Sequence, residues 1–152
     1  MKKEGSFSSF GRKAFFIEEY LVLWYNSIRK DGAIMKENLL IDKPIAFASR
    51  IIKLHQYLIK TKKETIISKQ IVRSGTSIGA NINEANYGQS KADFVSKMHI
   101  ALKETAETEY WLKLLTMSEY ISEDMGKSLL NDCLEIKRIL VASINTAKEN
   151  KQ

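Results

Sequence analysis

Hydrophobic side chains recur at intervals of three and four residues along four stretches of the chain, the period of an α-helix buried on one face. The first stretch runs from about Pro44, a residue suited to a first helical turn, to Lys62. The second runs from about Thr65 to Asn86, after a polar turn at 60–64. Their apolar stripes are Ala48, Ile51, Ile52, His55, Leu58 and Ile59, then Ile67, Ile71, Ser74, Ile78, Ile82 and Ala85.

The third and fourth stretches each follow a serine that can cap a helix N-terminus. Ser90 has Asp93 three residues later, and Ser122 precedes two acidic residues that suit the positive end of a helix. We expect the third helix to reach about Tyr120 and the fourth to reach about Ala147. Their stripes are Phe94, Met98, Ala101, Leu102, Thr105, Leu112 and Leu115, then Met125, Leu129, Cys133, Ile136, Leu140, Ile144 and Ala147.

Four helices with short connections predict an all-α fold, an antiparallel up-down-up-down four-helix bundle spanning residues 35–152. No stretch alternates strongly enough to favour a strand. Residues 1–34 have a different composition, with four of the six phenylalanines, and are predicted to be an N-terminal extension. We expect translation to begin at Met35, which makes the extension a mis-assigned start or a poorly ordered segment.

Composition agrees with long helices and restricts the setting of the protein. One proline and seven glycines occur among 152 residues. The single cysteine, Cys133, excludes an intramolecular disulfide and favours the reducing cytoplasm. The longest apolar run, residues 20–25, is far shorter than the roughly 20 residues that span a bilayer, so we expect no membrane association.

Positive charge is concentrated in one part of the chain. The formal net charge is +6, and residues 35–90 contain nine Lys or Arg against four Asp or Glu. A basic face attracts nucleic acid, anionic lipid or an acidic partner, although it can also be an ordinary solvated helix face. The candidate nucleic-acid-binding residues are Arg50, Lys53, Lys60, Lys62, Lys63, Lys69 and Arg73.

The run from Arg73 to Leu115 combines small and polar residues that helices usually avoid. Gly75 and Gly79 each cost roughly 1 kcal/mol relative to alanine in a helix, which indicates close approach between helix backbones. Beside Arg73, the spacing predicts a polar network that fixes the register of two helices, or alternatively a ligand or nucleic-acid contact. Its members are Ser77, Asn81, Glu84, Glu104 and Glu107.

The sequence offers no recognisable catalytic or metal-binding set. A di-iron bundle needs Glu-x-x-His pairs, but Ser96 precedes His99 and Ile52 precedes His55 at that spacing. Cys133 lies on an apolar stripe without an obvious base. We therefore expect no enzyme activity, metal or cofactor, and we assign the aromatic pair Tyr110 and Trp111 to an interface.

The centre of the chain carries the motif Ser-Ile-x-x-Asn-Ile-x-Glu, followed by a helix-capping Ser, an early Phe, an Ile-Ala pair, a Glu and a Leu. The residues are Ser77, Ile78, Asn81, Ile82, Glu84, Ser90, Phe94, Ile100, Ala101, Glu107 and Leu112. In this motif the chain resembles the family of 23S rRNA-intervening-sequence proteins, whose members carry a close variant of it. The resemblance covers roughly residues 35–147.

The resemblance implies a bundle but not a biochemical role. Similar bundles include the accessory variability determinant of diversity-generating retroelements, a basic homopentamer that works with a reverse transcriptase and binds nucleic acid. By resemblance we expect a homopentamer, with RNA or DNA, a reverse transcriptase or another protein as possible partners. The function expected first is non-catalytic nucleic-acid binding through the basic surface; the alternative is an oligomeric protein-interaction scaffold.

Overall fold

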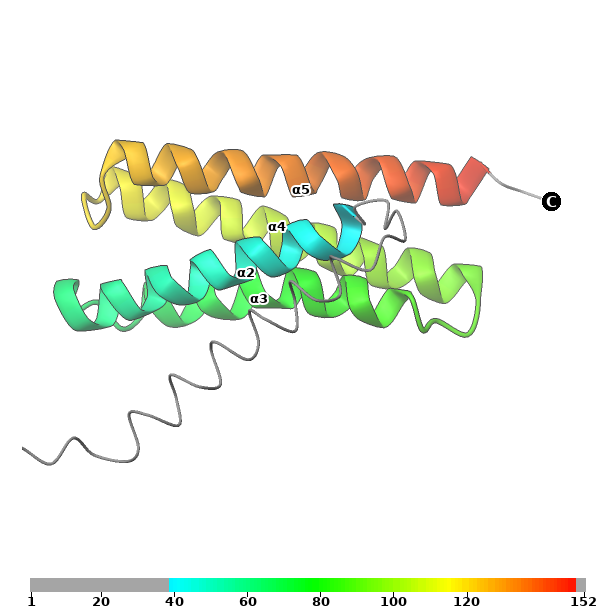
Figure 1. Ribbon diagram of the computed structural model, residues 1–152, viewed down its shortest axis with the longest axis horizontal. Coiled ribbons are helices and arrows are strands. Elements are labelled where there is room, and N and C mark those ends of the chain that lie inside the picture. Colours follow the sequence, from blue (N-terminus) through cyan, green and yellow to red (C-terminus); the bar gives the residue numbers. More distant parts are fainter. Residues whose placement is uncertain (1–38, 150–152) are drawn as a thin grey trace, which may run out of the picture. The chain divides into compact units, whose positions relative to one another are not determined.

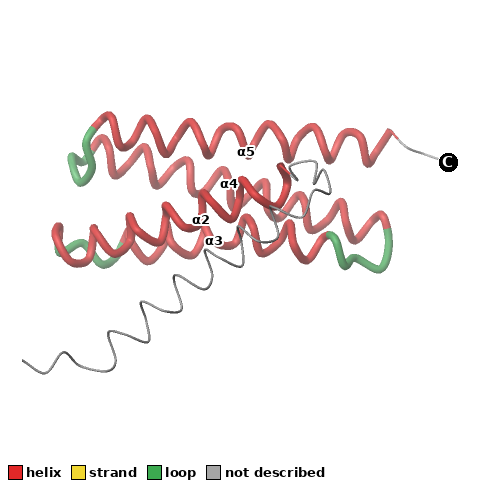
Figure 2. Tube along the Cα trace, in the orientation of Figure 1, coloured by secondary structure: helices red, strands yellow, loops and turns green. Residues whose placement is uncertain are grey.

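The computed structural model describes residues 39–149, which contain four α-helices, one π-helical segment and no strand (Figures 1 and 2). This composition confirms the predicted all-α class. Among the described helices, none has the length and apolar character needed to cross a membrane. The elements are α2 (Leu39–Tyr57), η1 (Leu58–Lys62), α3 (Ile67–Ala85), α4 (Lys91–Met117) and α5 (Glu123–Glu149). The predicted extension, residues 1–34, lies outside the described residues.

Helix α2 begins five residues before the predicted start, so Pro44 lies inside the helix rather than at its beginning. The inward face is also rotated from the prediction, because it centres on Phe47 and Leu54 together with Ile51 and Leu58. Ile52, expected on the buried stripe, is 42% exposed because each step along an α-helix turns the side chain by about 100°. The first predicted stripe was therefore partly wrong.

The buried face of α3 agrees with its predicted stripe, and its two glycines meet α2 differently. A Cβ added to Gly75 would lie 2.9 Å from Cγ2 of Ile51, which is too close for real carbon atoms. A Cβ added to Gly79 would lie 3.4 Å from Cβ of Pro44, an ordinary contact. Close backbone approach therefore accounts for Gly75 but does not require glycine at position 79.

Both predicted serine caps are present. The hydroxyl of Ser90 accepts a hydrogen bond from the amide of Asp93 at 3.1 Å, and that of Ser122 accepts from the amide of Met125 at 3.2 Å. Helix α4 ends at Met117, three residues before its predicted end, and Glu119 then takes a left-handed backbone conformation with φ of 59°. The fourth stripe is confirmed except at Met125, which is 39% exposed.

The four helices share one hydrophobic core. Helix α3 packs against both α2 and α4, while α5 packs against α4 and α2 (Figure 1). The core consists of Phe47, Ile51, Leu54, Leu58, Ile71, Ile78, Ile82, Ala85, Met98, Ala101, Leu112, Leu115, Ile121, Leu129, Cys133, Ile136, Leu140 and Ile144. The α2–α3 turn and the α4–α5 loop lie at the same end of this core (Figure 1).

Candidate nucleic-acid interface

Five of the predicted basic residues are exposed lysines around the connection between α2 and α3. None of the five forms an ion pair with any residue between 39 and 149. They come from the second half of α2, from η1, from the turn and from the first turn of α3. We call this set the lysine end; it consists of Lys53, Lys60, Lys62, Lys63 and Lys69.

A π-helical turn at the end of the α2 helical path presents Lys60, Lys62 and Lys63. The backbone continues past Tyr57 as the π-helical segment η1, and Lys63 then adopts a left-handed conformation with φ of 56°. The amide of Glu64 donates to the carbonyl of Leu58 at 3.0 Å, and so does the amide of Lys63. The predicted turn at 60–64 therefore begins later, because η1 extends to Lys62.

The side chain of Glu64 stabilises the turn. Its carboxylate is buried and accepts hydrogen bonds from the amides of Ile66, Ile67 and Ser68 at 2.8, 2.9 and 2.7 Å. The first amides of a helix have no partner within it, and a negative charge is favourable there. The Nδ1 atom of His55 lies 3.0 Å from the carbonyl oxygen of Ser68, which ties the same point to α2. Glu64 thus fixes the start of α3 beneath the lysine end.

Sequence reasoning missed this role of Glu64. It assigned the residue to a polar, lysine-rich turn. The sequence signal for this helix-capping role is a glutamate two to four residues before a helical stripe. It differs from the usual signal, which is a serine, threonine or aspartate directly at the cap position.

Arg50, the first residue of the predicted basic set, lies apart from the lysine end. Its guanidinium forms an ion pair with Asp132 and donates to the hydroxyl of Ser128 at 2.8 Å. About two turns earlier on α2, Lys43 pairs with Glu135 at 2.8 Å. These contacts attach α2 to α5 and occupy the Arg50 charge within the chain.

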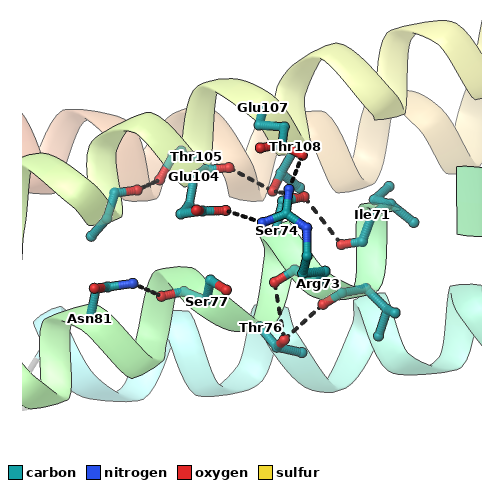
Figure 3. Close-up of polar contacts among 12 residues, drawn as sticks. Ile71, Arg73, Ser74, Thr76, Ser77, Asn81, Glu104, Thr105, Glu107 and Thr108 are labelled. Atoms are coloured by element: carbon teal, nitrogen blue, oxygen red, sulfur yellow. Dashed lines mark hydrogen bonds and ion pairs between the residues drawn. The ribbon is translucent and has the colours of Figure 1, made fainter. Parts of the chain in front are cut away.

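Arg73, the last residue of the basic set, lies between α3 and α4 (Figure 3). Its guanidinium forms a hydrogen-bonded ion pair with Glu107 and lies 3.6 Å from a carboxylate oxygen of Glu104. The indole N–H of Trp111 donates to the same Glu107 carboxylate at 3.1 Å. We call these four residues the ion cluster. The sequence predicted its three charged members together, and the structure brings them together.

The pKa values of Glu107 and Arg73 are both shifted towards the charged form, as expected for an ion pair. Burial alone would raise the pKa of Glu107, but hydrogen bonds from Trp111 and Arg73 and the Arg73 charge outweigh it and hold that pKa below its usual value. The hydrogen bond to Glu107, together with its charge, raises the pKa of Arg73. The Arg73 charge is therefore largely compensated within the chain.

The rest of the predicted polar network divides into separate contacts. The side-chain amide of Asn81 donates to the backbone carbonyl of Ser77 at 2.9 Å (Figure 3). Glu84 pairs instead with Lys97 at 2.6 Å, and this contact raises the pKa of Lys97. The residues predicted to form one network from Ser77 to Glu107 therefore form three separate groups. These are the ion cluster, a local contact within α3 and a second α3–α4 ion pair.

A buried hydroxyl pair between α3 and α4 completes this region and was not predicted. The hydroxyl oxygen of Thr108 lies 2.9 Å from that of Ser74 and 2.8 Å from the carbonyl oxygen of Glu104 (Figure 3). Both side chains are fully buried. The sequence analysis placed Ser74 on the apolar stripe of α3. A small polar residue on such a stripe was the available signal for a buried hydroxyl contact with another helix.

The remaining side chains that could carry chemistry are the cysteine, the possible metal ligands and the aromatic pair. Cys133 is buried, and burial raises the pKa of its thiol to about 12. Within residues 39–149, no three His, Cys, Asp or Glu side chains gather as metal ligands would. Tyr110 is 57% exposed and stacks edge-on against Trp111, with ring centroids 4.9 Å apart.

Comparisons with known proteins place the chain in a family. The model of the 23S rRNA-intervening sequence protein family matches residues 36–142. The chain is similar to a crystallised protein of unknown function from the S23 ribosomal protein family of Bacteroides thetaiotaomicron VPI-5482. The two share 52% identity over 69% of this chain and 97% of that one, with a TM-score of 0.69. No curated protein matches the sequence. The chain belongs to the 23S rRNA-intervening sequence protein family.

Proposed function

We propose that this protein is a non-catalytic, oligomeric nucleic-acid-binding protein of the cytoplasm, which holds structured RNA or DNA through the lysine end. This proposal rests on one observation: the five lysines are exposed and have no ion-pair partner in the described part of the chain. Unpaired surface cations attract phosphates and release counterions on binding. Arg50 and Arg73 contribute mainly to the structure because they form ion pairs with Asp132 and Glu107.

The proposed protomer is an antiparallel up-down-up-down bundle. Contacts between neighbouring helices support this arrangement, since residue numbers rise on one helix as they fall on the next. Ile51 approaches Gly75, whereas the earlier Pro44 approaches the later Gly79. Arg73 pairs with Glu107, whereas the later Glu84 pairs with the earlier Lys97.

Five such protomers are proposed to form a homopentamer, as in the retroelement accessory protein that the chain resembles. Exposed apolar side chains on the outer surface are available for subunit contacts, among them Ile45 at 63% and Ile52 at 42% exposure. A pentamer would multiply the +6 charge of each chain by five. The resulting potential would strengthen attraction to polyanions.

A salt titration tests the proposed binding. Purified protein is mixed with fluorescently labelled structured RNA or duplex DNA, and affinity is measured by anisotropy from low to physiological salt. We expect binding at low salt and a linear fall of log affinity with log salt. An absence of binding to both at low salt contradicts the proposal. Sedimentation of the same samples gives the oligomeric state, and a monomer at working concentration contradicts the pentamer.

The second candidate is an oligomeric scaffold for a protein partner, a reverse transcriptase or another protein. Large apolar side chains on the described surface favour it, notably Ile66 at 77%, Tyr110 at 57% and Met117 at 83% exposure. Aromatic and methionine side chains are enriched at protein interfaces. Complex formation that tolerates high salt and persists after nuclease treatment would favour this candidate over the first.

A further inference from the structure

A depression opens beside the lysine end, between the end of α2 with η1 and the α4–α5 loop. Its volume is about 640 Å³, within the range of small-ligand pockets. Lys62 lies on one side, and the loop residues lie on the other. The side chains that matter for binding are Tyr57, Lys62, Glu119, Tyr120 and Glu123.

The two tyrosines give the depression firm aromatic walls. Tyr57 and Tyr120 are half-buried, and both pack against the hydrophobic core. Side chains held in this way lose little freedom when a ligand binds, and an aromatic face stacks on any base. Lys53 lies one turn before Tyr57 on α2, so the lysine end continues along this side.

Two glutamates give one side of the depression a negative charge. Glu119 and Glu123 are exposed, and neither forms an ion pair with another described residue. Their negative charges repel phosphate, so the sugar-phosphate backbone is favoured on the lysines and disfavoured in the depression. A carboxylate accepts hydrogen bonds, and the exocyclic amines of bases can supply them.

We infer that the depression receives one unpaired base bearing an amino group, guanine best of all, while the lysine end holds the adjoining phosphates. This inference rests on the proposed nucleic-acid binding and makes it specific for single-stranded segments. Guanine presents two neighbouring N–H donors to a carboxylate. Uracil presents one N–H flanked by carbonyl oxygens, which a carboxylate repels. A duplex cannot place a base in the depression without unpairing it.

The test compares a labelled short oligouridylate with the same oligomer carrying one central guanine. We expect the guanine oligomer to bind wild-type protein about tenfold more tightly, within the range of a good bidentate base contact. The double variant Glu119→Gln/Glu123→Gln should lose this preference, and it should bind oligouridylate more tightly than wild type because two charges that repel phosphate are gone. Asp124→Asn removes a neighbouring exposed charge that does not line the depression, and it should leave the preference intact.

The possible outcomes separate the two proposals. Equal binding of both oligomers to wild-type protein overturns the base-specific inference but leaves nucleic-acid binding standing. A preference that survives in the double variant also overturns it. If neither oligomer nor structured RNA or DNA binds at low salt, the proposed function itself fails. Circular dichroism melting confirms that the variants, all at exposed positions, remain folded.

Discussion

The ion cluster and the lysine end are both rich in charge, but only the ion cluster brings opposite charges together. Arg73 faces two glutamates, and Glu107 also accepts from Trp111. The five lysines have no acidic partner among residues 39–149. A binding surface is therefore indicated by charges that lack partners, and not by the number of charges alone.

The two regions also differ in what lies beneath them. Under the ion cluster, the buried Ser74–Thr108 pair and Gly75 set the distance between helices. Under the lysine end, the Glu64 carboxylate holds the first amides of α3. We therefore expect changes around the ion cluster to affect stability, and changes of the lysines to affect binding.

The largest expected effect follows from removing three lysines. The variant Lys60→Ala/Lys62→Ala/Lys63→Ala should bind structured RNA about 100-fold more weakly at about 0.1 M salt. Each lost phosphate contact lowers the slope of log affinity against log salt by about 0.7 to 0.9, so three contacts amount to roughly 2 log units at about 0.1 M relative to 1 M salt. Its melting temperature should stay near that of wild type. Anisotropy titration and thermal melting measure the two quantities.

A matched control keeps this prediction specific. The variant Lys103→Ala/Arg138→Ala/Lys148→Ala removes the same charge from exposed positions on α4 and α5. We expect it to lose much less affinity. Equal losses in the two triple variants would mean that net charge, rather than the lysine end, carries binding.

Next in size is the effect of Glu64→Ala on stability. Three amides lose their acceptor, and we expect a loss of about 2 kcal/mol in the free energy of unfolding, at the upper end for helix caps. Ser90→Ala removes a single cap bond at the start of α4 and should cost less, about 1 kcal/mol. Urea denaturation compares them, and an equal or larger loss in Ser90→Ala would contradict the anchoring role of Glu64.

The two α3 glycines should respond in opposite directions to alanine. Gly75→Ala forces a Cβ against Ile51, and overpacking of about 1–3 kcal/mol exceeds the gain in helix propensity, so stability should fall. Gly79→Ala meets only ordinary contact and should gain up to about 1 kcal/mol. Chemical denaturation measures both. Stabilisation by Gly75→Ala would show that this approach of α2 and α3 is not tight.

The smallest effect is a pH dependence in the ion cluster. The pKa of Glu107 lies below its usual value in the folded chain, so its ionised form contributes stability that is fully present above that usual value. That stability is lost as the pH falls through the lowered pKa. The difference in melting temperature between wild type and Glu107→Gln should therefore be present at pH 7 and close in acid. A constant difference would exclude this electrostatic contribution.

Much of the fold could be predicted from the sequence because helix period and capping are local properties. Three of the four buried stripes, and the Ser90 and Ser122 caps, follow from spacings of three and four residues. The first helix was predicted less accurately. The predicted Ala48 lies only one residue from the buried Phe47, and the predicted His55 lies only one residue from the buried Leu54. The packing of α3 and α5 decides between them.

The candidate site was predicted less completely because pairing depends on residues distant in sequence. Arg50 and Arg73 were grouped with the lysines by charge, but Asp132 and Glu107, far along the chain, occupy them. Glu84 was grouped with Glu104, but it faces Lys97. The depression depends on bringing Tyr57 beside the loop that contains Glu119, which no local pattern indicates.

Ultraviolet crosslinking to bound RNA tests the central claim most directly. Wild-type protein is crosslinked to a labelled RNA at low salt, digested, and examined by mass spectrometry for nucleotide-bearing peptides. We expect these adducts on peptides from residues 53–69 and on the adjoining loop at 118–123. Adducts concentrated instead on residues 73–115, with the lysine peptides unmodified, would contradict it.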